Sequence, residues 1–239
     1  MKTHLLSALI CIVSLLSPVL VFADHSVEIF NGKDLSGWTR RGGNGTYDVE
    51  NGEIVGRSAP NTTNTFLCTD KQFGDFILEL DFKIDPTGHI FNSGVQIRSH
   101  SRPETDKFGD HIQRVFGYQV EIDTKEDRPW TGGIYFEGGI KENNGKVVMR
   151  GKNGWIYDLK NNKAAQQERH LGEWNHLKIA AKGRHIQTWL NGVKAADYTD
   201  KSKKYFTPNG FIALQVHAVG SSKDTKEVRF KNLKLTVLD

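Results

Sequence analysis

The sequence predicts an all-β protein, an antiparallel sandwich of two sheets formed by a single domain. Three observations favour this class. The 239 residues include 24 glycines, apolar and polar residues alternate in many short runs, and turn dipeptides separate these runs at close spacing. No stretch has the length and apolar periodicity of a core helix. Only the segment 162–170 is expected to form a helical turn or more, in a surface loop.

The clearest alternating runs predict eight strands, which lie at 76–84, 94–99, 117–123, 133–137, 176–182, 185–190, 210–218 and 228–237. Asn-Gly dipeptides such as Asn153-Gly154 and Asn191-Gly192 mark tight turns between strands, because both residues tolerate positive φ. The runs 176–181 and 185–190, followed by 193–195, predict consecutive antiparallel hairpins. The segment 101–115 is rich in charge and contains Pro103, so it is expected to be a long loop that covers a pocket, with disorder as the alternative.

The first 23 residues predict a secretory signal peptide. Lys2 precedes an apolar run from Leu5 to Phe22, and a small residue, Ala23, stands before Asp24. An uncleaved membrane anchor is disfavoured because the run is shorter than the roughly 20 residues that span a bilayer. The expected mature domain is therefore 24–239, exported to the periplasm or the medium without a stable membrane anchor.

Two cysteines are present, and Cys11 lies in the predicted signal peptide. Only Cys68 remains in the mature chain, so no internal disulfide is expected and stability must come from burial. Basic residues exceed acidic ones by four over the whole chain. They are scattered along it rather than concentrated in a stripe, so a nucleic-acid partner is not expected.

Polar residues that form directional hydrogen bonds recur on one face of four predicted strands. Residues two apart in a strand project from the same side of the sheet. In 118–123, Tyr118, Val120 and Ile122 are assigned to the core. The same rule places a polar row on the opposite side of the four strands, made of Gln96, Arg98, Gln119, Glu121, Asp123, Tyr135, Glu137, Gln215 and His217. We expect these side chains to converge on a polar, sugar-sized site rather than to form an idle solvent face.

The order of the motifs resembles the 3-keto-disaccharide hydrolase domain family over nearly all of the mature chain. The resemblance is carried by Phe30-Asn31-Gly32-Lys33-Asp34-Leu35-Ser36-Gly37-Trp38, Asn51-Gly52-Glu53-Ile54, Asn92-Ser93-Gly94-Val95-Gln96-Ile97-Arg98, Gly117-Tyr118-Gln119-Val120-Glu121-Ile122-Asp123, Gly133-Ile134-Tyr135, Trp174-Asn175, Leu190-Asn191-Gly192 and Leu214-Gln215-Val216-His217. It implies a concanavalin A-like jelly roll, export, and cleavage of glycosides whose sugar a separate dehydrogenase has oxidised at carbon 3.

A ketone at carbon 3 acidifies the hydrogen on carbon 2, so such a glycoside can be cleaved by elimination followed by hydration. This chemistry needs a base, donors for the enolate oxygen, and an acid for the leaving oxygen. We expect Glu121 or His217 as base, and Asp123 or Glu137 as the orienting or protonating group. Candidate substrate-binding residues are Gln96, Arg98, Gln119, Trp130, Tyr135 and Gln215, with Arg98 and Gln215 nearest the developing charge. A divalent cation held by the acidic residues and His217 is a possible cofactor.

Two other functions stay open at this point. Glu121, Asp123 and Glu126 fit a Glu-x-Asp-x-x-Glu pattern similar to that of retaining glycanases of glycoside hydrolase family sixteen, although Glu126 lies in a charged, turn-like segment. A carbohydrate-binding module without catalysis is the other alternative. In that case Trp130, Tyr135 and Trp155 would stack on sugar rings.

Overall fold

The computed structural model describes residues 26–86 and 91–238, so the predicted signal peptide lies outside the described residues. Within them the chain is nearly all β, with two large antiparallel sheets and the five-residue helix α1 (Lys163–Gln167). The helix lies inside the predicted segment 162–170, and Asn162 caps it by accepting a hydrogen bond from the backbone N–H of Ala165. No helix of the described part of the chain is long and apolar enough to cross a membrane.

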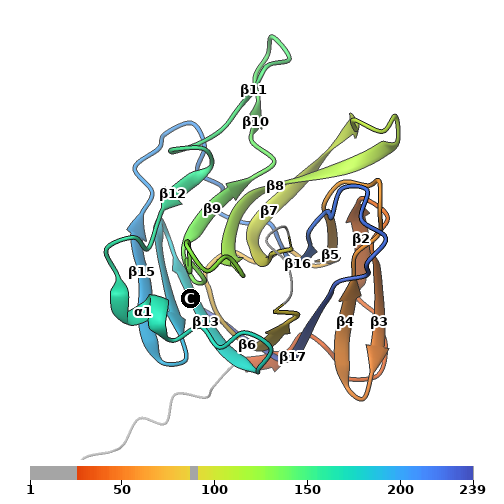
Figure 1. The fold of residues 1–239 in the computed structure, drawn as a ribbon. Helices are drawn as coiled ribbons and strands as arrows, with labels where there is room; N and C mark the ends of the chain where they lie inside the picture. The colour runs from red at the N-terminus through yellow and green to blue at the C-terminus, as the bar shows by residue number, and fades with distance from the viewer. Residues whose placement is uncertain (1–25, 87–90, 239) are drawn as a thin grey trace, which may run out of the picture.

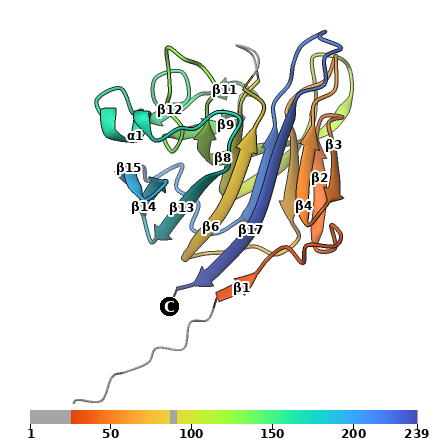
Figure 2. The ribbon, with the colours of Figure 1, turned by 60° about the horizontal axis from the view of Figure 1, so that its bottom comes forward.

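The first sheet, here called sheet 1, has the order β15-β14-β13-β6-β17-β4-β3, and β1 pairs with β17. Figure 2 shows β13, β6, β17 and β4 side by side. Its strands are β1 (Ser26–Glu28), β3 (Thr46–Glu50), β4 (Glu53–Arg57), β6 (Phe76–Ile84), β13 (Asn175–Lys182), β14 (His185–Leu190), β15 (Val193–Thr199) and β17 (Glu227–Val237).

The second sheet, sheet 2, has the order β12-β9-β8-β7-β16-β5-β2. Its strands are β2 (Trp38–Gly42), β5 (Thr65–Thr69), β7 (Ser93–Thr105), β8 (His111–Ile122), β9 (Ile134–Glu137), β12 (Trp155–Tyr157) and β16 (Phe211–Val216). A small separate hairpin of β10 (Ile140–Lys141) and β11 (Val147–Val148) projects from the body of the protein (Figure 1).

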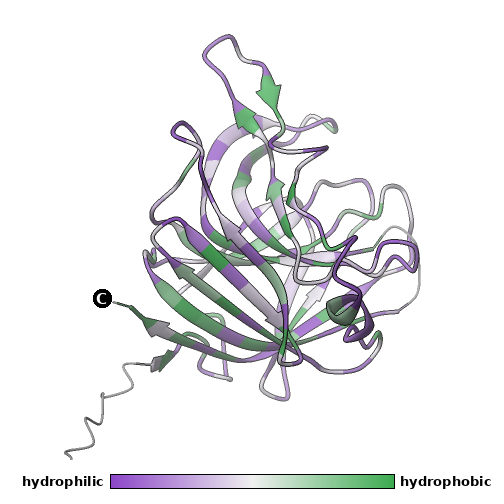
Figure 3. Cartoon of the chain, turned by 90° about the vertical axis from the view of Figure 1, so that its left-hand side faces the viewer, coloured by the Kyte–Doolittle hydropathy of each residue, from purple (hydrophilic) through white to green (hydrophobic). Residues whose placement is uncertain are grey.

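The main core fills the space between the two sheets. Val120 and Ile122 of β8 and Leu214 of β16 belong to the same buried cluster as Leu78 of β6 and Phe230 of β17, and all five are fully buried. Full burial of side chains of this size contributes roughly 1.5–3 kcal/mol each. In Figure 3, hydrophobic and hydrophilic residues alternate along the strands, as expected for sheets with one face on this core. The predicted all-β sandwich is confirmed.

All eight predicted strands are present, six of them with at most small shifts at their ends, whereas β7 and β8 are much longer than predicted. The loop predicted at 101–115 is wrong, because most of this segment continues β7 and β8 into a long hairpin that leaves the sandwich (Figure 1). Asp106 closes its turn by accepting hydrogen bonds from the backbone N–H groups of Phe108 and Asp110. Polar residues lie on both faces of the projecting hairpin because it has no core to cover, which removes the alternation that identifies a half-buried strand.

Candidate functional site

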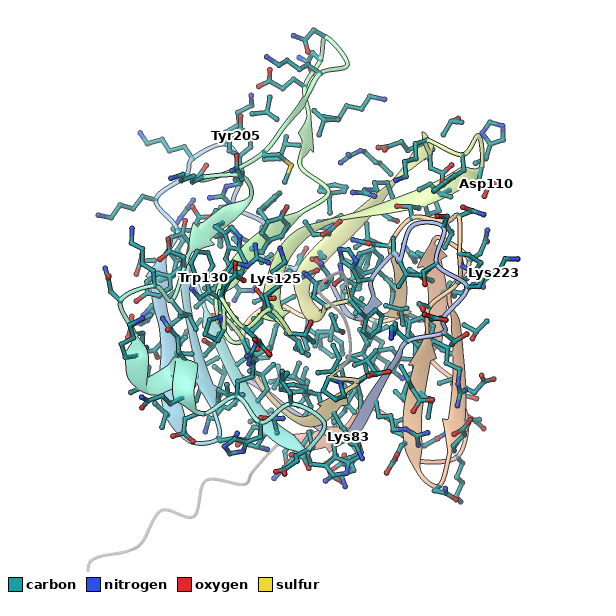
Figure 4. All side chains as sticks on the ribbon, in the orientation of Figure 1. Lys83, Asp110, Lys125, Trp130, Tyr205 and Lys223 are labelled. Carbon is teal, nitrogen blue, oxygen red and sulfur yellow. The ribbon has the colours of Figure 1, made fainter. Side chains whose placement is uncertain are left out.

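A cavity of about 780 Å³ opens on the face of sheet 2 that points away from the core. Gln119 and Glu121 of β8 line it, whereas their neighbours Tyr118, Val120 and Ile122 point into the main core. Glu137 of β9 and Gln215 of β16 add to the floor, and Tyr135 of β9 also lines the cavity. The segments 123–130 and 152–160 form a wall, and Figure 4 shows Lys125 and Trp130 of this wall together.

A chain of hydrogen bonds fixes the amide groups on the floor. Ser99 Oγ donates to Gln96 Oε1 at 2.7 Å, and Gln96 Nε2 donates to Gln119 Oε1 at 2.6 Å. Gln119 Nε2 then donates to Glu121 Oε2 at 2.7 Å and to Gln215 Oε1 at 3.4 Å. When Glu121 is ionised its carboxylate can only accept, and the direction of each amide in the chain follows from that. Gly94 leaves room for this arrangement, since a Cβ there would lie 2.5 Å from Gln119 Cγ.

Glu121 is almost completely buried, with 3% of its surface exposed. Asn92 Nδ2 donates to its Oε1 at 2.8 Å, so both carboxyl oxygens have an amide partner. Burial, together with the nearby charge of Asp123, raises the pKa of Glu121 to about 8 against the opposing hydrogen bond from Gln119. Glu121 is therefore largely protonated at neutral pH and can act as an acid.

His217 and Gln215 each have one nitrogen atom without a hydrogen-bond partner among the described residues. His217 Nδ1 lies 2.7 Å from the carbonyl oxygen of Ala218, which can only accept, so Nδ1 carries the proton and Nε2 of the neutral ring has a free lone pair. Burial lowers the pKa of His217, against the Ala218 hydrogen bond and the charges of Glu137 and Asp123. Gln215 Nε2 is buried without a hydrogen-bond partner among the described residues. The cavity thus contains a candidate base and a candidate donor for an anionic oxygen.

The other two acidic residues of the predicted site are paired with arginines. Arg128 Nε lies 2.7 Å from Asp123 Oδ2, and Arg114 Nη2 lies 3.2 Å from Glu137 Oε1. Asp123 also accepts a hydrogen bond from the backbone N–H of Lys125. These pairs hold the carboxylates in place, and they favour an orienting role for Asp123 and Glu137.

Aromatic rings form one wall of the cavity. The rings of Trp130 and Trp155 meet edge to face with centroids 4.8 Å apart, and Tyr135 meets Trp155 in the same way at 5.5 Å. The guanidinium of Arg128 lies 5.0 Å from the ring centroid of Trp155. Such a wall can stack on the apolar face of a sugar or of an aromatic leaving group.

Eight of the ten predicted site residues line the cavity: Glu121, His217, Asp123, Glu137, Gln119, Trp130, Tyr135 and Gln215. Gln96 does not reach it, and its amide instead orients Gln119 from behind. Glu126 of the glycanase-like pattern is exposed and does not line the cavity. The structure therefore does not bring the two outer glutamates of that pattern together there.

The predicted substrate-binding role of Arg98 is wrong, because its side chain points away from the cavity. The pairing of β7 with β8 shifts register between Ile97 and His100, and Arg98 has a φ of 47°. This bulge ends the alternation on which the prediction depended. The buried guanidinium instead donates to the carbonyl oxygens of Gly74 and Gly183 and pairs with Asp75 at 2.7 Å.

The four predicted metal-ligand candidates do not form a coordination set. Among residues 26–86 and 91–238, no three His, Cys, Asp or Glu side chains gather closely enough to hold a metal ion. Asp123 and Glu137 direct oxygens at arginines, and Glu121 directs both of its oxygens at amides. The donors present therefore do not fit a divalent cation.

Sequence reasoning missed Asn92 and Asn64 in the cavity lining. In the sequence Asn92 stands out only as part of a family motif, yet it donates to Glu121 and its Oδ1 is buried without a partner in the described part of the chain. Asn64 lies in a loop distant in sequence from the other site residues and accepts a hydrogen bond from the N–H of Ala218. The Asn-Ser-Gly sequence at the start of β7 is the available signal for Asn92, whereas nothing local marks Asn64.

Comparison with known families agrees with this geometry. The profile of 3-keto-alpha-glucoside-1,2-lyase-like domains matches residues 25–236. The chain belongs to this family. Comparison with curated proteins gives no match.

Solved structures related to this lyase-like domain are distant in sequence. A protein of Parabacteroides distasonis named as a candidate glycosyl hydrolase is 23% identical, with a TM-score of 0.56 over 90% of this chain and 94% of that one. A Bacillus subtilis protein with a galectin-like fold has a TM-score of 0.56 at 10% identity, over 88% and 94% of the two chains. The carbohydrate recognition domain of Emp47p has a TM-score of 0.53 at 12% identity, over 90% and 96%. These likenesses establish the galectin-like jelly-roll fold of the lyase-like domain.

Proposed function

We propose that this lyase-like domain cleaves 3-keto-glycosides by elimination followed by hydration. The observation that carries the proposal is a pair of nitrogens without partners on two residues that line one cavity, a lone pair on His217 Nε2 and a buried N–H donor on Gln215 Nε2. One can accept a proton while the other donates to a developing oxyanion. Family membership supports the same chemistry.

In the first step, His217 Nε2 removes the proton from carbon 2 of the keto sugar. The electron pair of the C2–H bond moves toward the ketone, and the enolate oxygen at carbon 3 accepts a hydrogen bond from Gln215 Nε2. The enolate then forms a double bond between carbons 1 and 2 as the bond from carbon 1 to the leaving oxygen breaks. Glu121 gives that oxygen its proton, which its raised pKa allows at neutral pH.

The second step adds water across the new double bond. The ionised Glu121 takes a proton from water as the hydroxyl adds to carbon 1, and protonated His217 returns a proton to carbon 2. Both groups are then restored to their starting states. The net change is hydrolysis of the glycosidic bond, with the ketone at carbon 3 unchanged.

The test is release of the leaving group from 3-keto glucosides and from their unoxidised parents, with and without a chelator. We expect release from the keto substrates alone, unchanged by the chelator. His217→Gln should lose about 10²- to 10⁴-fold in kcat. His111→Gln, on the projecting hairpin, is the matched control and should keep normal activity. Release from the parents, or normal activity of His217→Gln, would sink this mechanism.

The aromatic wall favours a second candidate, a carbohydrate-binding module without catalysis. Trp130, Trp155 and Tyr135 are arranged to stack on a ring whether or not a reaction follows. Under this alternative the protein binds both keto and parent glycosides with no release of product. Calorimetric binding combined with product analysis separates the two functions.

We also propose that the domain works outside the cytoplasm, following the predicted signal peptide. Its substrate already carries a ketone, and nothing in the proposed reaction oxidises a sugar. A separate dehydrogenase acting at carbon 3 must therefore supply it.

A further inference from the structure

The cavity carries more cationic charge than a neutral sugar needs. Five cationic and four acidic side chains line it, and two arginines pair with Asp123 and Glu137. The remaining cations are Lys125, Lys152 and Lys160, and none of them forms an ion pair within the described residues.

Among the described residues of the lining, two acidic groups lack an arginine partner. One is Glu121, which is largely protonated at neutral pH because its pKa is about 8. The other is Asp158, whose Oδ1 accepts the backbone N–H of Lys160 at 3.3 Å. Three unpaired lysines therefore outnumber the acidic groups without an arginine partner, and the cavity attracts anions.

The lysines lie on the wall and not on the floor. Arg169 fixes the backbone at Lys125. Its Nη1 donates to the carbonyl oxygens of Asp123 and Lys125 at 2.8 Å each. Lys125 is half-buried, and Lys160 is exposed at the rim. The reacting groups, by contrast, come from β8 and from β16 and the residue that follows it.

Lys152 and Trp155 are presented together by a tight hairpin. Their backbone groups exchange two hydrogen bonds of 3.1 Å, and Asn153 and Gly154 between them have φ values of 54° and 92°. Positive φ at both central residues is the type I′ geometry that an Asn-Gly pair favours. Residues directly opposite in such a pair project from the same face, so the side chains of Lys152 and Trp155 leave the hairpin on the same side.

From these positions we propose that the wall forms a subsite for an anionic leaving group, one that carries a carboxylate, sulfate or phosphate on a flat apolar ring. The ring stacks on one indole of the perpendicular Trp130–Trp155 pair, and Lys152, Lys160 and Lys125 face its charge. The inference rests on the proposed cleavage of 3-keto-glycosides, because the keto sugar must occupy the floor beside His217 and leaves the wall to the group on carbon 1.

The test uses two matched substrates, the 4-carboxyphenyl and 4-carbamoylphenyl 3-keto-glucosides, which differ mainly in charge. We expect kcat/KM to favour the carboxylate by about tenfold at low salt, and the preference to shrink as salt screens the lysines. The double variant Lys152→Gln, Lys160→Gln should lose most of this preference while keeping turnover of the neutral substrate. Lys223→Gln, an exposed lysine that Figure 4 shows away from Lys125 and Trp130, is the control and should keep the preference.

A binding measurement separates failure of the subsite from failure of the proposed function. The unoxidised 4-carboxyphenyl and 4-carbamoylphenyl glucosides are titrated against the same variants, with indole fluorescence as the readout. A lysine-dependent preference for the anion without any turnover of keto substrates would support the subsite and reject the lyase function. Turnover with equal kcat/KM for both substrates, or a preference that survives the double variant, would overturn the subsite. Sulfate- and phosphate-bearing aryl glucosides then show which anion the wall prefers.

Discussion

Glu121 is a single residue whose burial provides an acid for the reaction and lowers the stability of the folded protein at alkaline pH. Its carboxyl is buried beside Asp123, and its pKa is raised from 4.5 to about 8. The folded state therefore holds a proton that the unfolded chain releases between these values, so the stability contributed by this group falls as pH rises from about 5 to 8. The cost of ionising Glu121 in the folded protein is of the order of a few kcal/mol above pH 8.

We therefore predict that Glu121→Gln raises the thermal midpoint relative to the wild type at pH 9 but not at pH 5. Asn92 can accommodate the new amide by turning its own, because its buried Oδ1 has no partner among the described residues. Turnover should fall about 10²-fold or more in the same variant. Thermal unfolding at the two pH values measures the effect, and a variant that is less stable than wild type at pH 9 would contradict it.

His217 and Glu121 together predict a bell-shaped dependence of kcat/KM on pH. The rate should rise as His217 loses its proton, at a pH below the ordinary histidine value of 6.5 because burial lowers its pKa. It should fall again near pH 8, as Glu121 ionises and can no longer protonate the leaving group. Initial rates from pH 5 to 10 test both limbs. A profile that keeps rising through pH 9 would show that Glu121 is not the acid.

The prediction of the site from the sequence fails at the bulge in β7. Alternation places Gln119, Glu121, Tyr135, Glu137 and Gln215 on the correct face because their strands pair regularly there. The same rule fails at Arg98, since a bulge depends on the partner strands and leaves no period in the chain's own sequence. Asn64 is missed for a related reason, because only tertiary pairing brings its loop to the cavity.

Arg98 consequently predicts a stability effect without a binding effect. Arg98→Met removes hydrogen bonds to Gly74 and Gly183 and leaves Asp75 without its ion pair, so it should cost about 3 kcal/mol of unfolding free energy. KM for the keto substrate should stay within about twofold of wild type at a temperature where the variant is folded. Urea unfolding and steady-state kinetics measure the two effects. A raised KM with normal stability would restore the substrate-binding role expected from the sequence.

A substitution in the Lys152–Trp155 hairpin should cause a defect confined to the cavity wall. A Cβ at Gly154 would lie 2.2 Å from the ring of Tyr135, and its φ of 92° is strained for any other residue. Gly154→Ala should therefore displace the wall and raise KM severalfold.

Gly145→Ala provides the matched control for this change. Gly145 has a similar φ of 82°, but no atom lies within 4 Å of its Cβ position, so the variant carries the backbone strain without the clash. It should leave KM unchanged. Equal KM values for the two variants would show that the wall does not contact the substrate.

The whole molecule combines a fold that sequence periodicity predicts with a site that depends on tertiary contacts. The sequence predicts the two sheets because apolar and polar residues alternate along most long strands, which cover one core with one face. The exception is β5, which is buried along its full length and has no such alternation. Cys68 is the free cysteine of the described residues, and it is buried in β5. Burial rather than a disulfide holds the described sheets together.

The claim that His217 takes the proton from carbon 2 is tested most directly by a kinetic isotope effect. Deuterium is placed at carbon 2 of an aryl 3-keto-glucoside, and kcat/KM is compared with that of the unlabelled substrate. Because the proposed first step breaks this C–H bond, we predict a ratio of about 2 or more in favour of the unlabelled substrate when that step limits the rate. In the His217→Gln variant, removal of the proton itself is slow and substrate binding cannot limit the rate, so the effect should be retained or increased. A ratio of one in both proteins, with normal release of the leaving group, would contradict elimination and favour direct hydrolysis at carbon 1.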